Sequence, residues 1–196
     1  MINPAIHNKV IWITGASGGI GEALARELAA DGARLILSAR RLNELERVKA
    51  SLANSNQHLL IPLDITDINA VSAAIATIEQ QIGGLDWLIN NAGIMRRGNI
   101  LDISVDDWND LFAVNINAMF HLCRAALPHM IAGGGGAIVN TASQWGLHPA
   151  PNCIGYNVTK AAVASFSQNL ARDYAPHNVR VNAVCPGEIH TPMLEA

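Results

Sequence analysis

A chain of 196 residues with a formal net charge of −3 is long enough to bury most of the apolar surface of one domain. Half of the residues are hydrophobic and 15% are charged. The lysines and arginines are scattered, which argues against nucleic-acid binding, and no apolar run is long enough to span a membrane. The N-terminus lacks the charged-then-apolar order of a signal peptide. These features predict a soluble protein with neither nucleic acid nor membrane as a partner.

The cysteines and histidines indicate neither a disulfide framework nor a metal site. Cys123, Cys153 and Cys185 are odd in number, far apart and in no C-x-x-C arrangement. They are interpreted as reduced thiols, which predicts a cytoplasmic protein. The seven histidines include no pair with metal-ligand spacing, so no metal is expected.

Short apolar runs alternate with longer amphipathic stretches along the whole chain. The runs are continuous in apolar residues, as parallel strands covered on both faces require. They predict strands at Val10–Ile13, Leu35–Ser38, Leu59–Pro62, Trp87–Asn90, Ala137–Thr141 and Val179–Val184. The amphipathic stretches predict helices at Ile20–Asp31, Leu42–Ala53, Ile68–Ile82, Ser104–Ile131 and Tyr156–Ala175.

Residues at the helix boundaries support these limits. Asp67 and Ser104 stand where N-caps are favourable, and Gly32 and Gly83 follow helices as C-terminal glycines do. The alternation of strands and helices predicts an α/β domain with βαβ units, a parallel sheet and right-handed crossovers.

A glycine-rich segment, Thr14–Gly21, follows the first predicted strand directly and leads into the first predicted helix. Its glycines permit a tight turn and let a pyrophosphate approach the backbone, and the helix N-terminus supplies free N–H groups. The spacing Gly15-x-x-x-Gly19-x-Gly21 is one residue longer than the G-x-G-x-x-G fingerprint. A simple turn is the alternative, but the position between strand and helix favours dinucleotide binding.

The second predicted strand ends in Ser38-Ala39-Arg40-Arg41. NAD-binding folds usually place an acidic residue near this strand end to hold the ribose 2′-hydroxyl, whereas an arginine accommodates a 2′-phosphate. The alternative for Arg40 is a solvated residue at a helix N-terminus, where its charge opposes the helix dipole. The segment favours NADP(H) over NAD(H).

Tyr156 and Lys160 form a Y-x-x-x-K spacing, with Ser143 thirteen residues upstream of the tyrosine. On a helix, residues four apart share a face, with Cβ atoms about 5–6 Å apart. A lysine charge at about 4 Å contributes about 4 kcal/mol at an effective dielectric near 20, so we expect it to lower the tyrosine pKa toward neutrality. That pair suits general acid–base catalysis. The alternative is a half-buried tyrosine beside a solvated lysine.

Six motifs in the right order make the sequence resemble the short-chain dehydrogenase/reductase family, from Lys9 to about Thr191. The resemblance implies a Rossmann-type doubly wound parallel sheet, strand order 3-2-1-4-5-6, with helices on both faces and residues 1–196 as a single dinucleotide-binding domain. The matching segments are Thr14–Gly21, Asn90–Gly93, Val114-Asn115, Ser143 with Gly146, Tyr156 with Lys160, and Asn182–Thr191.

The resemblance also implies a reaction: hydride transfer between a nicotinamide and a ketone or secondary alcohol, similar to the 3-oxoacyl reductases and sugar-alcohol dehydrogenases. Tyr156 is then the acid/base, and Lys160 lowers its pKa and holds the nicotinamide ribose. Ser143 stabilises the substrate oxygen, and Asn115 positions a water that connects Lys160 to solvent. Without the resemblance, a structural kink is the preferred interpretation of Asn115, and a helix N-terminal acid that of Asp64.

The resemblance further implies a set of cofactor-binding residues from several segments of the chain. Its expected members are Gly15, Ser17, Gly19, Ile20, Gly21, Arg40, Asp64, Ile65, Asn90, Ala92, Gly93, Tyr156, Lys160, Pro186, Gly187, Ile189 and Thr191. Gln144, Trp145, His148 and Cys153, between Ser143 and Tyr156, are expected to line the substrate pocket and to suit a medium-sized, partly polar carbonyl compound.

The end of the sequence departs from the family pattern. Family members usually continue into a substrate-covering lid, another helix and a seventh strand, whereas this sequence stops at Glu195-Ala196. Because Met193–Ala196 is similar to an interrupted lid, we expect a cut protein rather than a naturally short chain.

The assembly and the activity each leave an alternative. We expect a homodimer that pairs through the helices Ser104–Ile131 and Tyr156–Ala175, or a homotetramer. The alternative to an enzyme is a non-catalytic dinucleotide-binding sensor or assembly protein. The absent lid favours that alternative, and the intact set of Ser143, Tyr156 and Lys160 opposes it.

Overall fold

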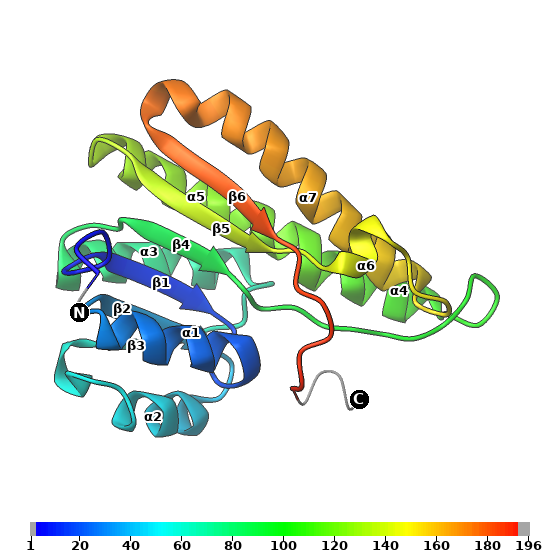
Figure 1. Ribbon diagram of the computed structural model, residues 1–196, viewed down its shortest axis with the longest axis horizontal. Helices are drawn as coiled ribbons and strands as arrows, with labels where there is room; N and C mark the ends of the chain where they lie inside the picture. The colour runs from blue at the N-terminus through cyan, green and yellow to red at the C-terminus, as the bar shows by residue number, and fades with distance from the viewer. Residues whose placement is uncertain (1–2, 192–196) are drawn as a thin grey trace.

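The computed structural model describes residues 3–191 and contains a six-stranded parallel sheet with helices on both faces (Figure 1). The strand order is β3-β2-β1-β4-β5-β6. The predicted doubly wound, Rossmann-type architecture and its order 3-2-1-4-5-6 are therefore confirmed. The strands are β1 (Val10–Thr14), β2 (Arg34–Ala39), β3 (Leu59–Pro62), β4 (Trp87–Asn90), β5 (Gly136–Thr141) and β6 (Val179–Val184).

Two apolar clusters, one on each face of the sheet, form the core. Ile11, Ile13 and Leu37 point to the side that α1 and α2 cover. Trp12 and Ile36 point to the side of α3, α5 and α7. Because both faces are covered, all five residues of β1 are buried, as the continuous apolar run predicted. The helices on the two faces are α1 (Gly19–Ala30), α2 (Leu42–Ala50), α3 (Ile68–Ile82), α5 (Ala118–Ala132) and α7 (Ile154–Tyr174).

Capping residues at the predicted positions end or begin several helices. The Asp67 carboxylate accepts hydrogen bonds from two backbone N–H groups in the first turn of α3. The Ser104 hydroxyl accepts one from Asp107 N at 2.9 Å at the start of α4 (Val105–Phe112). Gly83 ends α3 with a φ of 90°, a left-handed conformation that glycine adopts without strain. The described chain also contains two short 3₁₀ helices, Ser55–Gln57 and Ala175–His177, and a four-residue helix α6 (Gln144–Leu147).

The prediction of one uninterrupted helix over Ser104–Ile131 was wrong. A π-helical turn, η2 (Ala113–Asn117), separates α4 from α5, and the N–H of Ala118 donates to the carbonyl of Ala113, five residues earlier. Asn115 is the buried residue of this turn, and its amide is hydrogen-bonded to both backbone groups of Ile94. The wider turn is what brings that side chain inward, and such turns are frequent at functional sites.

The order of the strands places a crevice beside β1. Chain connections leave β1 toward β2 on one side, and β4 returns on its other side, so the helices that follow these strands diverge. Ligands of open α/β sheets bind at such a switch point, outside the carboxyl ends of the strands.

Within residues 3–191, no helix has the length and apolar character required to cross a bilayer. The segment Met193–Ala196, interpreted from the sequence as the start of a lid, lies outside the described residues.

Candidate active site

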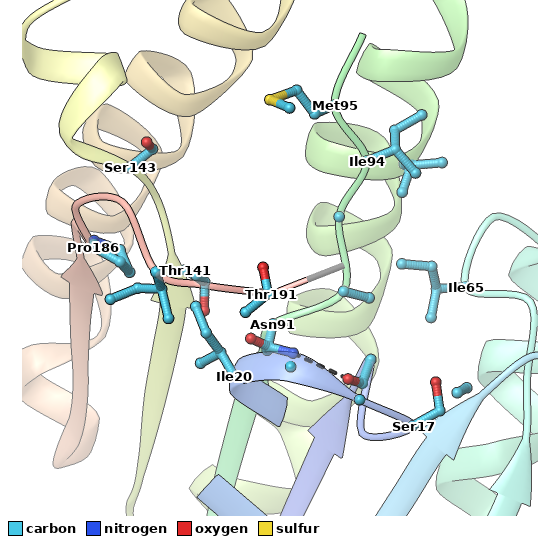
Figure 2. Close-up of a pocket in the computed structure, with 18 of the residues that line it drawn as sticks. Ser17, Ile20, Ile65, Asn91, Ile94, Met95, Thr141, Ser143, Pro186 and Thr191 are labelled. Carbon is cyan, nitrogen blue, oxygen red and sulfur yellow. Dashed lines mark hydrogen bonds between the residues drawn. The ribbon is translucent and has the colours of Figure 1, made fainter. Parts of the chain in front are cut away.

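A cleft of about 1340 Å³ lies along the carboxyl edge of the sheet. Figure 2 shows it extending from Ser17 and Ile65 at one end to Ser143 and Met95 at the other. Most of its lining comes from segments 15–20, 38–41, 63–66, 91–96, 141–145 and 186–191. Loops that are far apart in the sequence therefore meet at the switch point.

Most of the residues predicted for the cofactor and the substrate line this one cleft. Five do not: Gly21, Asn90, Asn115, His148 and Cys153. Those that do are Gly15, Ser17, Gly19, Ile20, Arg40, Asp64, Ile65, Ala92, Gly93, Ser143, Gln144, Trp145, Tyr156, Lys160, Pro186, Gly187, Ile189 and Thr191.

Gly21 lies beneath the cleft and shapes it through close packing. A Cβ on Gly21 would stand 2.2 Å from the carbonyl oxygen of Gly15 and 2.7 Å from Asn91 Nδ2. Helix α1 can therefore begin directly below the glycine-rich loop. Gly15 itself has a φ of 67°, in the left-handed region. The glycines of the loop and the N-terminus of α1 thus leave a stretch of open backbone, the cradle, that fits a pyrophosphate.

The side chain of Asn90 points away from the cleft, contrary to its predicted place along the ribose. Its Nδ2 donates to Asn140 Oδ1 at 2.8 Å and contacts Cys123 Sγ at 3.3 Å in the core. Asn91 lines the cleft instead, and its Nδ2 donates to the carbonyls of Thr14 and Gly15. Successive side chains at a strand end face opposite sides, so only one of the two asparagines can face the cleft.

At the end of the cleft beside β2 and β3, a cation and an anion lie near one another. Arg40 is exposed, and its charge contributes to lowering the pKa of Asp64. The main cause of that lowering is hydrogen bonding from Thr66, whose Oγ1 donates to Asp64 Oδ1 at 2.7 Å. In the described part of the chain, the Arg40 side chain has no hydrogen bond or ion pair with another residue. Its guanidinium donors remain available to an anionic ligand.

At the opposite end of the cleft lie Ser143, Tyr156 and Lys160. Each of them exposes less than a tenth of its surface to solvent. The α7 helix places Tyr156 and Lys160 on one face, as their spacing predicted, with Lys160 Nζ 5.6 Å from the tyrosine ring centroid. Lys160 Nζ donates to the carbonyl of Thr141 at 2.8 Å. Burial lowers the pKa of Lys160 to about 8.

The expected direction of the Tyr156 pKa was wrong for this structure. Burial raises the pKa of the phenol, and hydrogen bonding with the Ser143 side chain lowers it by less. The lysine amine lies over the ring and bonds to Thr141, so its charge does not offset the desolvation. At neutral pH the phenol therefore carries its proton.

Asn115 acts on the site from below, through hydrogen bonds rather than from the cleft. Its Oδ1 accepts from Ile94 N at 2.9 Å, and its Nδ2 donates to Ile94 O and to Thr159 Oγ1. Thr159 is fully buried and donates to the carbonyl of Tyr156 at 2.8 Å. The cleft wall at Ile94 is thereby tied to the helix that carries Tyr156. Both hydrogens of Nδ2 are used, so this amide has no N–H left to donate to a water.

Two of the residues predicted for the substrate pocket do not line it. His148 is exposed. Cys153 is buried in a small cluster with Leu111 and Tyr156. Gln144 and Trp145 do line the cleft, and Trp145 meets Tyr156 edge to face, with ring centroids 6.0 Å apart.

Comparison with known proteins identifies the family. A family model described as short chain dehydrogenase matches residues 9–196. The human protein "Dehydrogenase/reductase SDR family member 7" is 39% identical over 194 residues, covering 96% of this chain and 57% of that protein. The chain belongs to the short-chain dehydrogenase/reductase family. The predicted membership in a family of enzymes that act on alcohol and carbonyl groups is confirmed.

Solved structures of other family members match the fold of this chain over nearly its whole length. A 3-ketoacyl-(acyl-carrier-protein) reductase from Brucella melitensis, complexed with NADH, has a TM-score of 0.93 and 32% identity; the match covers 97% of this chain and 79% of that one. An L-sorbose reductase from Gluconobacter frateurii, complexed with NADPH and L-sorbose, has a TM-score of 0.90 and 36% identity, with coverages of 95% and 72%. Structures solved with NADH and with NADPH are therefore both similar to this chain.

Several residues of this family member escaped the sequence interpretation. Asn91 and Thr159 stand inside motifs that were recognised for their neighbours, so their positions carried a signal. Glu22 and Arg47 also line the cleft and pair with each other across 25 residues of sequence, which no local pattern indicates. The short spacing Glu22–Arg26 is a common helical ion pair and signals only a solvated face.

We expect Gly21→Ala to destabilise the protein, because its Cβ would overlap the backbone of Gly15. Overpacking of this kind costs about 1–3 kcal/mol in unfolding free energy. Gly18→Ala is the matched control, since a Cβ there has no neighbour within 4 Å and the backbone is extended, with a φ of 179°. Urea unfolding of both variants measures the difference. Equal stability of Gly21→Ala and Gly18→Ala would contradict the packing described for the cradle.

Proposed function

We propose that this protein is an NADP(H)-dependent oxidoreductase that interconverts a ketone and a secondary alcohol, similar to the 3-oxoacyl reductases. The observation that carries the proposal is that Ser143, Tyr156 and Lys160 line the same cleft as the glycine-rich cradle. A dinucleotide laid along that cleft joins the anion-binding end to a buried proton donor. A bound nicotinamide dinucleotide supplies or accepts the hydride.

The chain's own residues account for the proton. The Tyr156 phenol is protonated at neutral pH because burial raises its pKa, so it can donate to a carbonyl oxygen. The Ser143 hydroxyl stands beside it and can stabilise developing charge on that oxygen. Lys160, with a pKa near 8, is mostly charged at neutral pH and lies next to the tyrosine ring. This arrangement supports carbonyl reduction, because in that direction Tyr156 can donate its proton directly and need not be deprotonated first.

The preference for NADP(H) rests on Arg40. It lines the cleft where β2 ends, and no acidic side chain lies at the neighbouring Ser38, Ala39 or Arg41. An unpaired guanidinium at that place suits a 2′-phosphate better than a ribose hydroxyl. Asp64 follows β3 rather than β2, and its Oδ1 is already engaged by Thr66.

We expect Tyr156→Phe to lower kcat/KM for carbonyl reduction by about 10²- to 10⁴-fold, because it removes the proton donor. The dissociation constant for NADPH, measured by nicotinamide fluorescence, should stay close to that of the unmodified protein. The control is Tyr174→Phe, which changes the chain's other tyrosine on the same helix. Retained turnover in Tyr156→Phe would overturn the proposed mechanism.

The alternative function, a dinucleotide-binding sensor or assembly protein without turnover, gives a different result in the same experiment. Such a protein binds NADPH, and neither it nor its Tyr156→Phe variant reduces any compound in a screen of carbonyl substrates. The buried Ser143, Tyr156 and Lys160 oppose this alternative, since a site that only binds has no need of a protonated phenol at its end.

We expect Arg40→Ala to weaken NADPH binding by about 10- to 100-fold, the loss typical of a charge-assisted hydrogen bond. NADH binding should change little, because it lacks the 2′-phosphate. Arg97→Ala is the control, an exposed arginine that does not line the cleft. Titrations of both cofactors measure the ratio of the two dissociation constants. Equal weakening of NADPH and NADH would remove the cofactor assignment.

We also propose that two copies pair through α5 and α7, giving a homodimer or a tetramer built from such dimers. A groove of about 500 Å³ on these helices is lined mainly by apolar side chains, among them Leu127, Phe166 and Leu170. Phe120 at its edge is 42% exposed. Such a surface is more typical of an interface than of a solvated face.

We expect Phe120→Glu to shift the protein toward the monomer in sedimentation equilibrium, because a charge in this groove opposes burial. Leu42→Glu is the control, a similarly exposed apolar residue on α2, on the opposite face of the sheet. A native protein that is monomeric at all concentrations would contradict the proposed pairing.

The three cysteines support a cytoplasmic location for the protein. All three are free thiols, and Cys123 and Cys153 are buried. Burial raises the pKa of Cys123 to about 12, so it stays a thiol at physiological pH. Free thiols are typical of a reducing compartment, and cell fractionation tests the location.

A further inference from the structure

A carboxylate lies at the end of the cleft that should bind phosphate groups. Glu22 is in the first turn of α1, one residue after Gly21, and it lines the cleft. Its side chain is 18% exposed. A negative charge in a first turn favours the helix, but it opposes any anion that binds at the same N-terminus. Binding of a pyrophosphate there requires that this charge be compensated.

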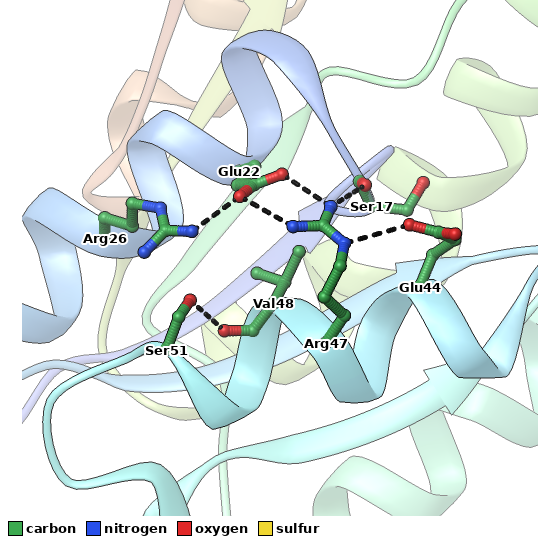
Figure 3. Close-up of polar contacts among 7 residues, drawn as sticks. All are labelled: Ser17, Glu22, Arg26, Glu44, Arg47, Val48 and Ser51. Atoms are coloured by element: carbon green, nitrogen blue, oxygen red, sulfur yellow. Dashed lines mark hydrogen bonds and ion pairs between the residues drawn. The ribbon is translucent and has the colours of Figure 1, made fainter.

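Two arginines compensate it (Figure 3). Arg47, from α2, donates in parallel to both oxygens of Glu22, with distances of 3.1 Å to Oε1 and 2.8 Å to Oε2. Arg26, one turn along α1, donates to Oε1 at 2.6 Å. Together they lower the pKa of Glu22 to about 2, with the Arg47 hydrogen bonds as the largest cause. Glu22 is therefore ionised at neutral pH, and its charge is paired rather than free.

Arg47 also contacts the glycine-rich loop directly. Its guanidinium donates to the carbonyl of Ser17 at 3.2 Å and to Glu44 Oε2 at 3.1 Å. Figure 3 shows this guanidinium lying between α2 and the start of α1, with its N–H groups directed at protein oxygens. In this respect it differs from Arg40, which lines the same cleft with its donors unpaired by described residues. The two arginines therefore cannot serve the cofactor in the same way.

We propose that Arg47 is a positioning residue for dinucleotide binding that acts by neutralising Glu22 at the pyrophosphate end of the cleft. The inference rests on the proposed dinucleotide binding and adds a residue that supports NADPH and NADH equally. Four of the five guanidinium N–H groups are already paired with Glu22, Glu44 and Ser17, so we expect Arg47 to support both cofactors rather than to select between them. Its loss leaves Glu22 paired with Arg26 alone, and leaves Glu44 without its ion pair, beside the phosphates.

The competing explanation is mechanical: Arg47 holds Ser17 in place, and the charge of Glu22 is irrelevant. The two explanations predict different effects on cofactor binding when the charge of Glu22 is removed from the Arg47 variant. If its charge is what Arg47 cancels, removing the charge rescues the Arg47 variant. If Arg47 serves only as a tether, removing Glu22 as well cannot restore the contact with Ser17.

The experiment compares Arg47→Met, Glu22→Gln and the double variant. Dissociation constants for NADPH and NADH are measured by nicotinamide fluorescence, and urea unfolding checks that each variant folds. We expect Arg47→Met to weaken both cofactors about tenfold, as uncompensated repulsion across the binding site implies. Glu22→Gln alone should bind at least as well as the unmodified protein, and the double variant should recover most of the loss. Glu46→Gln, an exposed carboxylate outside the cleft on α2, is the control.

Salt adds a second readout. Repulsion from an exposed carboxylate is screened, so the defect of Arg47→Met should shrink between about 0.05 M and about 1 M salt, whereas a lost tether persists. A double variant that binds as weakly as Arg47→Met would overturn the inference. So would a loss confined to NADPH.

The outcome separates this inference from the proposed activity. Rescue of binding in a protein that reduces no carbonyl compound supports the role of Arg47 and removes the oxidoreductase. An unmodified protein that binds neither dinucleotide, and that inorganic pyrophosphate does not stabilise against unfolding, overturns both.

Discussion

Hydrogen bonds of the Thr14 and Asn91 side chains, between the ends of β1 and β4, hold the functional part of this molecule together. The Thr14 hydroxyl accepts from the backbone N–H groups of Asn91 and Ala92, and Asn91 Nδ2 donates to the carbonyls of Thr14 and Gly15. The chain diverges at this place in the sheet, so the two halves of the sheet pair across β1 and β4. The cradle at α1 belongs to one half and the proton donor on α7 to the other. These bonds set the distance between them.

Burial of polar groups explains how the second half is kept rigid. Asn115, Thr159 and Lys160 are all nearly inaccessible, yet each side chain has hydrogen-bond partners on the backbone or on one another. An unpaired group at such depth costs far more than a paired one, so any displacement of α7 relative to the cleft wall carries a penalty. The same burial raises the pKa of Tyr156 and lowers that of Lys160. One physical cause thus fixes both the geometry of the site and its protonation.

The fold was predictable because its signals are local and repeated. Continuous apolar runs located every strand within two residues, and Asp67, Ser104 and Gly83 marked helix ends through capping chemistry that needs no tertiary contact. The π turn was missed because one inserted residue hardly changes a long amphipathic pattern. The backbone bond from Ala118 to Ala113, five residues apart, reveals the turn, and the contact of Asn115 with Ile94 lies across 21 residues of sequence.

The site was predictable to the level of segments but not of side-chain direction. A motif names both Asn90 and Asn91, and only the pleat of the strand decides which one faces the cleft. Likewise, His148 and Cys153 lie between two cleft residues in sequence, yet the first is solvated and the second is packed against Leu111. The predicted lowering of the Tyr156 pKa was wrong for a related reason. A four-residue spacing gives the separation of two Cβ atoms, whereas desolvation depends on everything packed around the phenol.

The roles of the arginines along the cleft depend on which of their N–H groups are already hydrogen-bonded, and the sequence alone does not show this. Arg40 and Arg47 both line the cleft, and nothing in their residue type distinguishes their roles. What separates them is the number of donors already used: Arg47 spends its guanidinium on Glu22, Glu44 and Ser17, and Arg40 spends none on described residues. A guanidinium whose hydrogen bonds are satisfied shapes the field in which a ligand binds, and one whose bonds are open binds the ligand itself. The different roles of the two arginines therefore follow from their hydrogen-bond partners, which only the three-dimensional structure shows.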